Sequence, residues 1–221
     1  MFLLLDKPKG ITSHDVVGKI RKISGERKVG HGGTLDPNAT GLIIIAIGRA
    51  STKKLEMFTK GMDKTYEAEI ILGEERNTDD VEGTVVRKCE KIPTKNDIKK
   101  VLEKFTGESR QVPPDFSAIK KGGKKAYELS RLGKNVDLKS RKIVIKSAKL
   151  LEYNYPRIEA VFEVSSGTYI RAIARDLGRE LGTYAYLNNL KRIKIGKFGL
   201  ERAVDLDILN SSNWENHAIE I

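Results

Sequence analysis

The feature that most restricts the fold is a continuous apolar run at 42–47, Leu-Ile-Ile-Ile-Ala-Ile, directly after a glycine-rich loop. A short apolar run rich in β-branched residues is typical of a strand that is buried on both faces. The loop before it, GHGGTLDPNATG at 30–41, combines four glycines with one histidine and one aspartate. The run therefore predicts a central strand with a polar loop just ahead of it.

Periodicity and capping residues predict the other elements. We expect strands at 2–5, 66–72, 141–153, 157–165 and within 187–200, and helices at 13–24, 52–58, 95–106 and 168–181, with an acidic loop at 73–83. Adjacent strands mixed with isolated helices indicate an α+β fold with a largely antiparallel or mixed sheet. A long basic segment with Pro and Gly, at 111–133, ends in a short helix.

Length and composition exclude several classes of protein. The 221 residues allow one or two domains with a sizeable core. No stretch reaches the roughly 18 consecutive apolar residues of a membrane helix, and the N-terminus lacks the pattern of a signal peptide. Cys89 is the single cysteine, which excludes a disulfide scaffold, and three scattered histidines make a metal centre unexpected. A reducing cytoplasm is the expected compartment.

The charge is strongly basic and uneven. The formal net charge is +11, and residues 205–221 hold four acidic residues without a Lys or Arg, so the rest of the chain carries +15. Such a domain repels itself unless it meets a polyanion. Nucleic acid is the first candidate partner and an anionic membrane surface the second. A lysine-rich solvated surface is the alternative.

Three polar residues stand at the edges of expected elements. Asp36 precedes Pro37, and from composition alone an Asx-turn is the better interpretation, although four glycines around it suit a backbone that approaches a ligand closely. Arg171 lies in the first turn of a helix, where the dipole disfavours a cation, so it should have an aspartate or a phosphate beside it. Tyr66 is either a core aromatic of its strand or a site residue.

Six motifs in order make the chain recognisable. They are DKPKGITSHDVV, GHGGTLDPNATGLI, KTYEAEIILG, QVPPDFSAIKKGGKKAYELSRLG, SSGTYIRAIARDLGRELG and LKRIKIGKF. Together they resemble the TruB family of tRNA pseudouridine synthases over nearly all of residues 2–200. Two departures are small: Phe116 stands where the family commonly has tyrosine, and LKRI replaces a more usual LRRT.

The resemblance implies a fold and a reaction. The fold is the pseudouridine synthase fold, an α+β domain with a central mixed, mainly antiparallel sheet, flanking helices and an RNA-binding cleft. The reaction isomerises uridine 55 of the tRNA T-loop, without cofactor or metal, after the base has flipped out of its stack. We expect a catalytic domain at 1–205 with an insertion-like subregion at about 73–140, and a short acidic tail at 206–221.

The resemblance also implies roles for individual residues. Asp36 matches the catalytic nucleophile, Tyr66 the tyrosine that packs on the target base and takes part in proton transfer at C5, and Arg171 the arginine paired with the catalytic carboxylate. Further substrate-contacting positions match His31, Tyr169 and Leu190. The basic segments 120–134, 139–149 and 191–197 form the expected RNA face, and its expected RNA-contacting residues are Lys120, Lys121, Lys124, Lys125, Lys191 and Arg192.

The expected partner is the T-arm stem-loop of tRNA, bound by a monomer with no membrane contact. Many bacterial members continue into a PUA domain, which this sequence is expected to lack. A dyskerin-like relative working with a guide RNA is one alternative, disfavoured by that expected lack, so no guide RNA is expected. A tRNA chaperone without catalysis is the other, disfavoured by the presence of Asp36, Tyr66 and Arg171.

Overall fold

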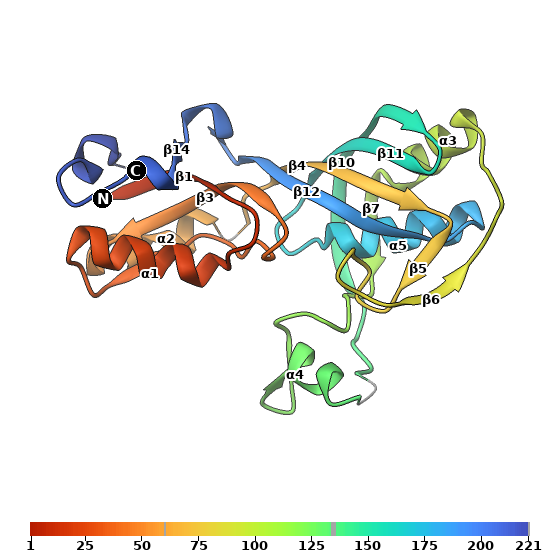
Figure 1. The fold of residues 1–221 in the computed structure, drawn as a ribbon, viewed down its shortest axis with the longest axis horizontal. Helices are drawn as coiled ribbons and strands as arrows, with labels where there is room; N and C mark the ends of the chain where they lie inside the picture. The colour runs from red at the N-terminus through yellow and green to blue at the C-terminus, as the bar shows by residue number, and fades with distance from the viewer. Residues whose placement is uncertain (60, 134–135, 221) are drawn as a thin grey trace. The chain divides into compact units, whose positions relative to one another are not determined.

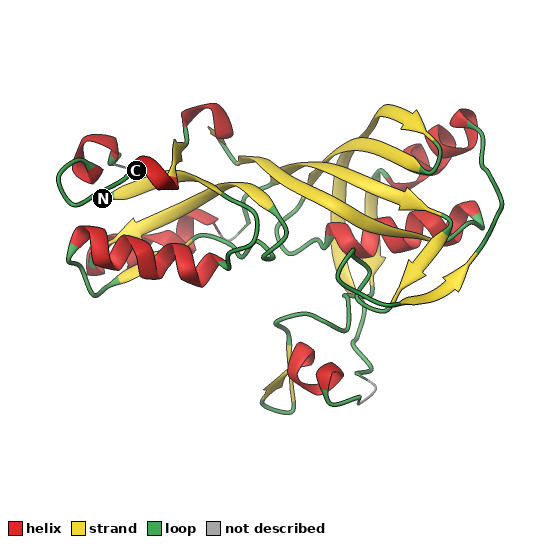
Figure 2. Cartoon of the chain, viewed as in Figure 1, coloured by secondary structure: helices red, strands yellow, loops and turns green. Residues whose placement is uncertain are grey.

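The computed structural model describes residues 1–59, 61–133 and 136–220. The chain forms two compact units: unit 1 comprises Met1–Glu67 with Leu190–Ile221, and unit 2 comprises Ala68–Asn189. Strands, turns and loops make up most of the described residues, and short helices lie between them (Figures 1 and 2). Two long strands, β4 and β12, have residues in both units.

Unit 1 is built on a sheet with the strand order β14-β1-β3-β12, with β2 paired to β3 and β13 to β12. Its strands are β1 (Phe2–Lys7), β2 (Val29–His31), β3 (Thr40–Ile47), β12 (Ala185–Ile195), β13 (Phe198–Gly199) and β14 (Val204–Asp205). Its helices are α1 (Ser13–Ser24) and α2 (Arg49–Thr59), with single 3₁₀ turns at Leu200–Arg202, Leu206–Ile208 and Trp214–His217. The β1–β14 and β3–β12 pairs are parallel, whereas β1–β3 and β2–β3 are antiparallel.

Both faces of β1 and β3 are buried, as the apolar run at 42–47 predicted. Ile43 and Ile45 face α1, and their neighbours Leu42 and Ile44 face Leu55 of α2. Successive side chains of a strand point to opposite faces, so an unbroken apolar run fills two core layers at once. Each fully buried aliphatic side chain contributes roughly 1.5–3 kcal/mol by leaving water.

Local signals set the ends of α1. Thr12 accepts from the backbone N–H of Asp15, and the Asp15 carboxylate accepts from the Thr12 backbone, which forms a capping box. Gly25 ends the helix in the left-handed conformation, with φ of 70°. Thr94 and Asp97 form the same box at the start of α3.

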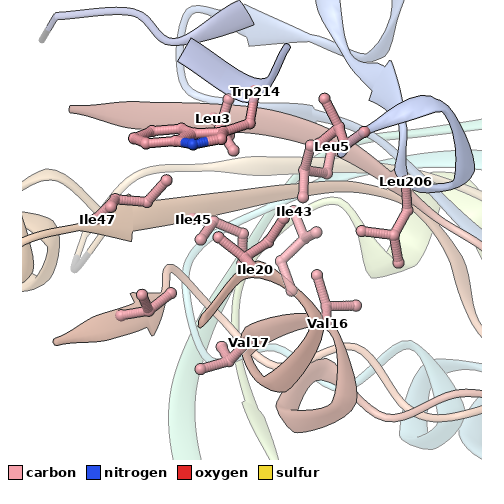
Figure 3. Close-up of a cluster of buried hydrophobic side chains, with 12 residues drawn as sticks. Leu3, Leu5, Val16, Val17, Ile20, Ile43, Ile45, Ile47, Leu206 and Trp214 are labelled. Carbon is pink, nitrogen blue, oxygen red and sulfur yellow. The ribbon is translucent and has the colours of Figure 1, made fainter. Parts of the chain in front are cut away.

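The last residues of the chain belong to the core of unit 1. Leu206, Leu209 and Trp214 are buried in one cluster with Leu3 and Val16. Figure 3 shows the Trp214 indole beside Leu3, with Val16 of α1 reaching up towards β3. The backbone of Ile219 exchanges two hydrogen bonds with Phe2, at 2.9 and 2.8 Å. The acidic segment expected as a tail therefore covers one face of β1.

Unit 2 contains a sheet with the strand order β4-β11-β10-β7 and two separate two-stranded ribbons. The β10–β11 and β10–β7 pairs are antiparallel. Its strands are β4 (Lys64–Leu72), β5 (Glu74–Arg76), β6 (Val85–Lys88), β7 (Gly107–Gln111), β8 (Lys120–Lys121), β9 (Lys124–Lys125), β10 (Arg141–Asn154) and β11 (Arg157–Val164). Its helices are α3 (Lys95–Phe105), α4 (Ala126–Arg131) and α5 (Ile170–Leu181).

The predicted α+β class with a mixed, mainly antiparallel sheet is confirmed. One segment was predicted wrongly: 73–83 is not wholly a loop, because Glu74–Arg76 forms β5 and pairs with β6. The expected domain boundaries and RNA-binding cleft stay predictions. Within the described ranges, no helix is long and apolar enough to cross a membrane.

We expect Trp214→Ala to lower the free energy of unfolding by roughly 3–5 kcal/mol, because it leaves a cavity in the core of unit 1. The control is Ile208→Ala in the same segment, where the side chain is 55% exposed and the cost should be small. Urea unfolding measures both variants. An equal, small effect for the two substitutions would show that the C-terminal segment does not stabilise unit 1.

Candidate functional site

Asp36 lies on a tight turn within the loop 30–41. Its backbone carbonyl accepts a hydrogen bond from the N–H of Ala39 at 3.0 Å, which closes a turn with Pro37 at its second position. Main-chain atoms therefore make this turn, although the residues alone also suited an Asx-turn. The Asp36 side chain is half-buried, and the turn holds it at a fixed place in the loop.

The segment before Asp36 is attached to the start of α1. The buried Ser13 hydroxyl donates to the Leu35 carbonyl at 3.0 Å and accepts from the Leu35 N–H at 2.8 Å. On the other side of Asp36, the Pro37 carbonyl accepts from Gly10 N–H at 2.9 Å. Both neighbours of Asp36 in the chain are thus anchored to residues of the first motif.

Arg192 lies completely buried beneath this loop. Its guanidinium donates to the carbonyls of Leu42 at 2.7 Å, Gly33 at 3.1 Å and Thr34 at 3.4 Å. Gly41 pairs with Arg192 at a φ of 100°, and a Cβ there would lie 2.3 Å from the Arg192 carbonyl oxygen. Only glycine allows this close approach, and it lets the side chain of Arg192 reach under the loop.

The burial of Arg192 corrects its predicted role. A side chain with no exposed surface that donates to three carbonyls holds the loop and does not meet RNA phosphates. Its neighbour Lys191 is exposed, because successive side chains of β12 point to opposite faces. The contact of Lys191 with RNA stays a prediction.

A second buried cation, Lys7, supports the loop from β1. Its ammonium donates to the carbonyls of Pro8 at 2.9 Å, Ile11 at 2.8 Å and Pro37 at 3.2 Å. Burial lowers the pKa of Lys7 to about 8, and the negative charge of Asp36 opposes that lowering. Lys7 therefore remains mostly charged at neutral pH and attracts the carboxylate of Asp36.

A third buried cation, Lys64, shares one face of β4 with Tyr66. Both side chains are 7% exposed. The Lys64 ammonium donates to the Met62 carbonyl at 3.1 Å, and a Cβ on Gly33 would lie 3.6 Å from its side chain. Burial lowers the pKa of Lys64 to about 8, and the charge of Arg192 acts in the same direction.

The other expected substrate contacts of unit 1 are half-buried. They are His31, the last residue of β2, and Leu190 on β12. Burial lowers the pKa of His31, and the positive charge of Arg192 lowers it further. The imidazole is therefore mostly neutral at pH 7 and can accept as well as donate a hydrogen bond.

In unit 2, Arg171 has the anionic neighbour that its place in a first helical turn requires. Its guanidinium lies 3.3 Å from a carboxylate oxygen of Asp80 and donates to the carbonyls of Thr78 and Phe116 at 3.1 and 3.0 Å. Asp80 belongs to the segment 73–83 that was expected to be a solvated loop. The expected pairing of Arg171 with Asp36 joins residues of the two units and stays a prediction.

Two further arginines of α5 repeat this arrangement. Arg175 donates to Asp79 at 2.8 Å and to the Val112 carbonyl at 2.9 Å, and Arg179 binds both carboxylate oxygens of Glu75. Burial raises the pKa of Asp79 to about 6, which the charge of Arg175 opposes. These residues do not form a solvated basic stripe, the simplest interpretation of their spacing, because acidic residues of 75–80 pair with them.

Tyr169, half-buried, precedes the first residue of α5. Its backbone N–H donates to Gln111 Oε1 at 2.9 Å, and its carbonyl accepts from Gln111 Nε2 at 3.1 Å. The guanidinium of Arg141 covers its ring at 4.9 Å from the centroid. The structure thus fixes both the backbone and the ring of this expected substrate contact.

Four of the expected RNA-contacting lysines form a two-stranded hairpin. Lys120 stands opposite Lys125 and Lys121 opposite Lys124, and all four are exposed. Gly122 and Gly123 have φ of 58° and 83°, as a two-residue type I′ turn requires. Like charges directly opposite one another destabilise a ribbon, so an anion bound here would stabilise it. Residue 134 of the expected RNA segment lies outside the described residues.

The structure brings some predicted residues together and adds others. Asp36, Tyr66, His31 and Leu190 lie in unit 1, whereas Arg171, Tyr169 and the hairpin lysines lie in unit 2. Sequence reasoning missed Lys7, Lys64, Asp80 and Gln111 as members of these clusters. Two signals were available in the sequence: Lys7 ends an apolar strand, and Lys64 lies two residues before Tyr66. In the described part of the chain, no group of three or more His, Cys, Asp or Glu could hold a metal ion.

The sequence resembles curated proteins along almost its whole length. Residues 21–170 match the family described as TruB family pseudouridylate synthase (N terminal domain). The protein named tRNA pseudouridine synthase B of Aquifex aeolicus (strain VF5) is 45% identical, over 99% of this chain and 77% of that protein. The protein of the same name from Mycobacterium sp. (strain KMS) is 44% identical, over 99% of this chain and 74% of that protein.

Solved structures share the fold. A structure described as a Cbf5-Nop10-Gar1 complex matches 99% of this chain with a TM-score of 0.73 and 28% identity. A structure of an H/ACA RNP bound to a substrate RNA matches the same share with a TM-score of 0.70 and 26% identity. This chain spans 56% of each of those longer chains. By the match over residues 21–170 and the identity to its relatives, the chain belongs to the TruB family of pseudouridylate synthases.

Proposed function

We propose that this protein is an enzyme that converts uridine to pseudouridine in tRNA, and that its target is uridine 55 of the T-loop. Family membership and the relatives named tRNA pseudouridine synthase B support pseudouridine formation in tRNA. The choice of uridine 55 rests on the resemblance of the six ordered motifs to the TruB family. No cofactor and no metal take part in the proposed reaction.

The observation that carries this proposal is the support around Asp36. A half-buried carboxylate stands on a turn whose backbone is anchored to α1 and β1, with the buried cations Lys7 and Arg192 in the same unit. The charge of Lys7 attracts the Asp36 carboxylate, and the ionised form of a carboxyl group is the nucleophile. A loop that only turned the chain would not need buried cations to support it.

The proposed chemistry conserves every atom of the uridine. A T-loop base is stacked, so it must first be flipped into the site. Asp36 then attacks either C1′ of the ribose or C6 of the base. The bond between N1 and C1′ breaks, the base rotates, and a bond between C5 and C1′ forms. The bond from Asp36 to C1′ or C6 breaks, which restores the carboxylate. The proton leaves C5, and N1 gains a proton, so the product is an isomer of the substrate.

Tyr66 and Arg171 have distinct parts in this proposal. The buried ring of Tyr66 offers an apolar surface for the uracil, and its hydroxyl relays the proton of C5. Arg171, already held by Asp80, is proposed to orient the carboxylate of Asp36. His31, Tyr169 and Leu190 are proposed to contact the flipped nucleotide.

RNA affinity is assigned to the lysine hairpin at 120–125. Its four lysines face each other across two short strands, and a two-stranded ribbon is marginally stable by itself. Phosphates of the T-arm would relieve the repulsion between these ammonium groups. Shape and backbone contacts of this kind are typical of the recognition of folded RNA.

We expect Asp36→Asn to abolish pseudouridine formation while tRNA affinity stays within about two-fold, because the exchange removes charge and nucleophilicity but little volume. The measurement is tritium release from a 5-tritiated T-loop uridine under single-turnover conditions, together with filter binding. The control is Asp207→Asn, the same exchange at an exposed ion pair with Lys19. Retained release by Asp36→Asn would reject the nucleophile, and an inactive wild type would reject the enzyme.

Tyr66→Phe removes one hydroxyl and keeps the ring in place. We expect tRNA binding to persist and turnover to fall by about 100-fold, the usual scale for a lost acid–base group. Single-turnover rates at several pH values measure this effect. A rate close to that of the wild type would restrict Tyr66 to packing against the base.

Replacing Lys121 and Lys125 with alanine should weaken tRNA binding and flatten its dependence on salt, because fewer counterions are released from the RNA. The matched control replaces Lys104 and Lys142, two lysines of the same unit that pair with Glu180 and Glu108. Titrations at several salt concentrations give the two slopes. Equal slopes for both double variants would remove the hairpin from the RNA face.

A further inference from the structure

Gln111 is a buried polar residue to which neither the motifs nor the proposed chemistry assigns a role. It is the last residue of β7, it is 3% exposed, and its amide makes two hydrogen bonds with the backbone of one residue, Tyr169. A buried amide must satisfy both its donor and its acceptor. Gln111 satisfies both with a residue that lies 58 positions further along the chain.

The two bonds fix the backbone of the residue that begins α5. Tyr169 is the N-cap of α5, its φ and ψ of −98° and 115° are extended, and its own side chain makes no capping bond. Because the Gln111 amide accepts from the N–H and donates to the carbonyl, it pairs with Tyr169 as a neighbouring strand would. The peptide groups on both sides of Tyr169 are therefore held in one orientation.

The same segment of chain also holds the arginines that follow Tyr169. The carbonyl of Val112 accepts from Arg175, and the carbonyl of Phe116 accepts from Arg171. The residues after Gln111 thus lie along the first turns of α5. Their contacts make the position of Gln111 and the start of the helix depend on each other.

The ring of Tyr169 is restrained on a further side by Arg141, the first residue of β10. The Arg141 guanidinium lies over the ring, and β7 pairs with β10 through Arg141 opposite Gln111. Two residues in register on adjacent strands therefore hold Tyr169, one by its backbone and one by its ring. Such a clamp limits the directions in which the ring can point.

We propose that Gln111 is a positioning residue of the isomerase, which sets the orientation of Tyr169 towards the flipped nucleotide. This inference rests on the proposed function. Gln111 acts through Tyr169, because its amide is buried and bonds the Tyr169 backbone through both its oxygen and its nitrogen. A displacement of about 1 Å in a group that aligns the substrate can lower a rate about 100-fold.

Gln111→Leu keeps the volume and removes both bonds. We expect the single-turnover rate of pseudouridine formation to fall about 10- to 100-fold, with tRNA affinity within about two-fold of the wild type. Hydrogen exchange of the Tyr169 amide should accelerate, because this N–H loses its acceptor. Circular dichroism checks that the variant is folded.

Gln111→Glu gives a readout that loss of stability does not explain. The ionised carboxylate can accept from Tyr169 N–H but repels the Tyr169 carbonyl, whereas the protonated carboxyl group can make both bonds. The charged groups near this place are the guanidinium groups of Arg141, Arg171 and Arg175 and the carboxylates of Asp80 and Asp79, which pair with the last two. Burial raises the pKa of Asp79 to about 6, but Asp79 is present in both proteins, so the variant is compared with the wild type at each pH. Relative to the wild type, the rate of this variant should recover as the pH falls through the pKa of the introduced carboxyl group.

The matched control is Glu108→Gln, the reverse exchange on the same strand. Glu108 is exposed and pairs with Lys142, so the rate and its pH profile should stay close to those of the wild type. If Gln111→Leu folds only partly, the rates of Gln111→Glu at two pH values still test the role of Gln111, because both rates come from the same variant. A pH profile for Gln111→Glu that is parallel to the wild type would overturn the inference.

A double-mutant cycle with Tyr169→Ala tests whether Gln111 acts through Tyr169. The cost of Gln111→Leu should largely disappear when the tyrosine side chain is absent. Additive losses in the two variants would overturn the proposed route. Wild-type enzyme that leaves uridine unchanged would reject the proposed function, whereas active wild type with an equally active Gln111→Leu would reject only the role of Gln111.

Discussion

The loop around Asp36 depends on the fully buried guanidinium group of Arg192. Arg192 donates to three carbonyls of the loop and of β3, which is acceptable in a core because each bond to a charged donor is stronger than a neutral one. Removing such a partner would leave buried carbonyls unsatisfied. Gly41 is needed for the same reason, since a side chain there would meet the Arg192 backbone. The loop that carries Asp36 therefore tolerates few substitutions at Arg192 or Gly41.

In unit 2, arginines of one helix, α5, are likewise held by specific partners. Arg171, Arg175 and Arg179 leave α5 at intervals of four residues and meet Asp80, Asp79 and Glu75. Breaking a buried pair such as Arg175–Asp79 costs roughly 3–5 kcal/mol, because one charge is left without a partner. The Arg179 side chain is 48% exposed, so its pair with Glu75 contributes less. Each of these pairs contributes zero to the net charge of +11, so the excess positive charge belongs to other residues, among them the exposed lysines at 120–125.

Local chemistry explains which predictions succeeded. The Thr12–Asp15 and Thr94–Asp97 boxes determine the starts of α1 and α3 within a few residues of chain, and alternation or continuity of apolar residues identified β3 and β4. The segment 73–83 was predicted as an acidic polar loop, because the partners of its acidic residues lie 96 and 104 positions further along the chain and leave no local signal. The prediction that Arg192 contacts RNA was wrong for a similar reason. Nothing in the motif LKRI distinguishes the buried Arg192 from the exposed Lys191 beside it.

The sequence by itself determined the family, the α+β class, the buried strand at 42–47 and the identity of Asp36, Tyr66 and Arg171 as candidates, because motifs and periodicity are local properties of the chain. Only the tertiary structure decided which charged residues are buried. Lys7 and Arg192 donate to carbonyls of one loop, and Gln111 reaches the backbone of Tyr169. Burial and pairing arise from contacts between distant segments, and a linear pattern of residue types does not encode those distances.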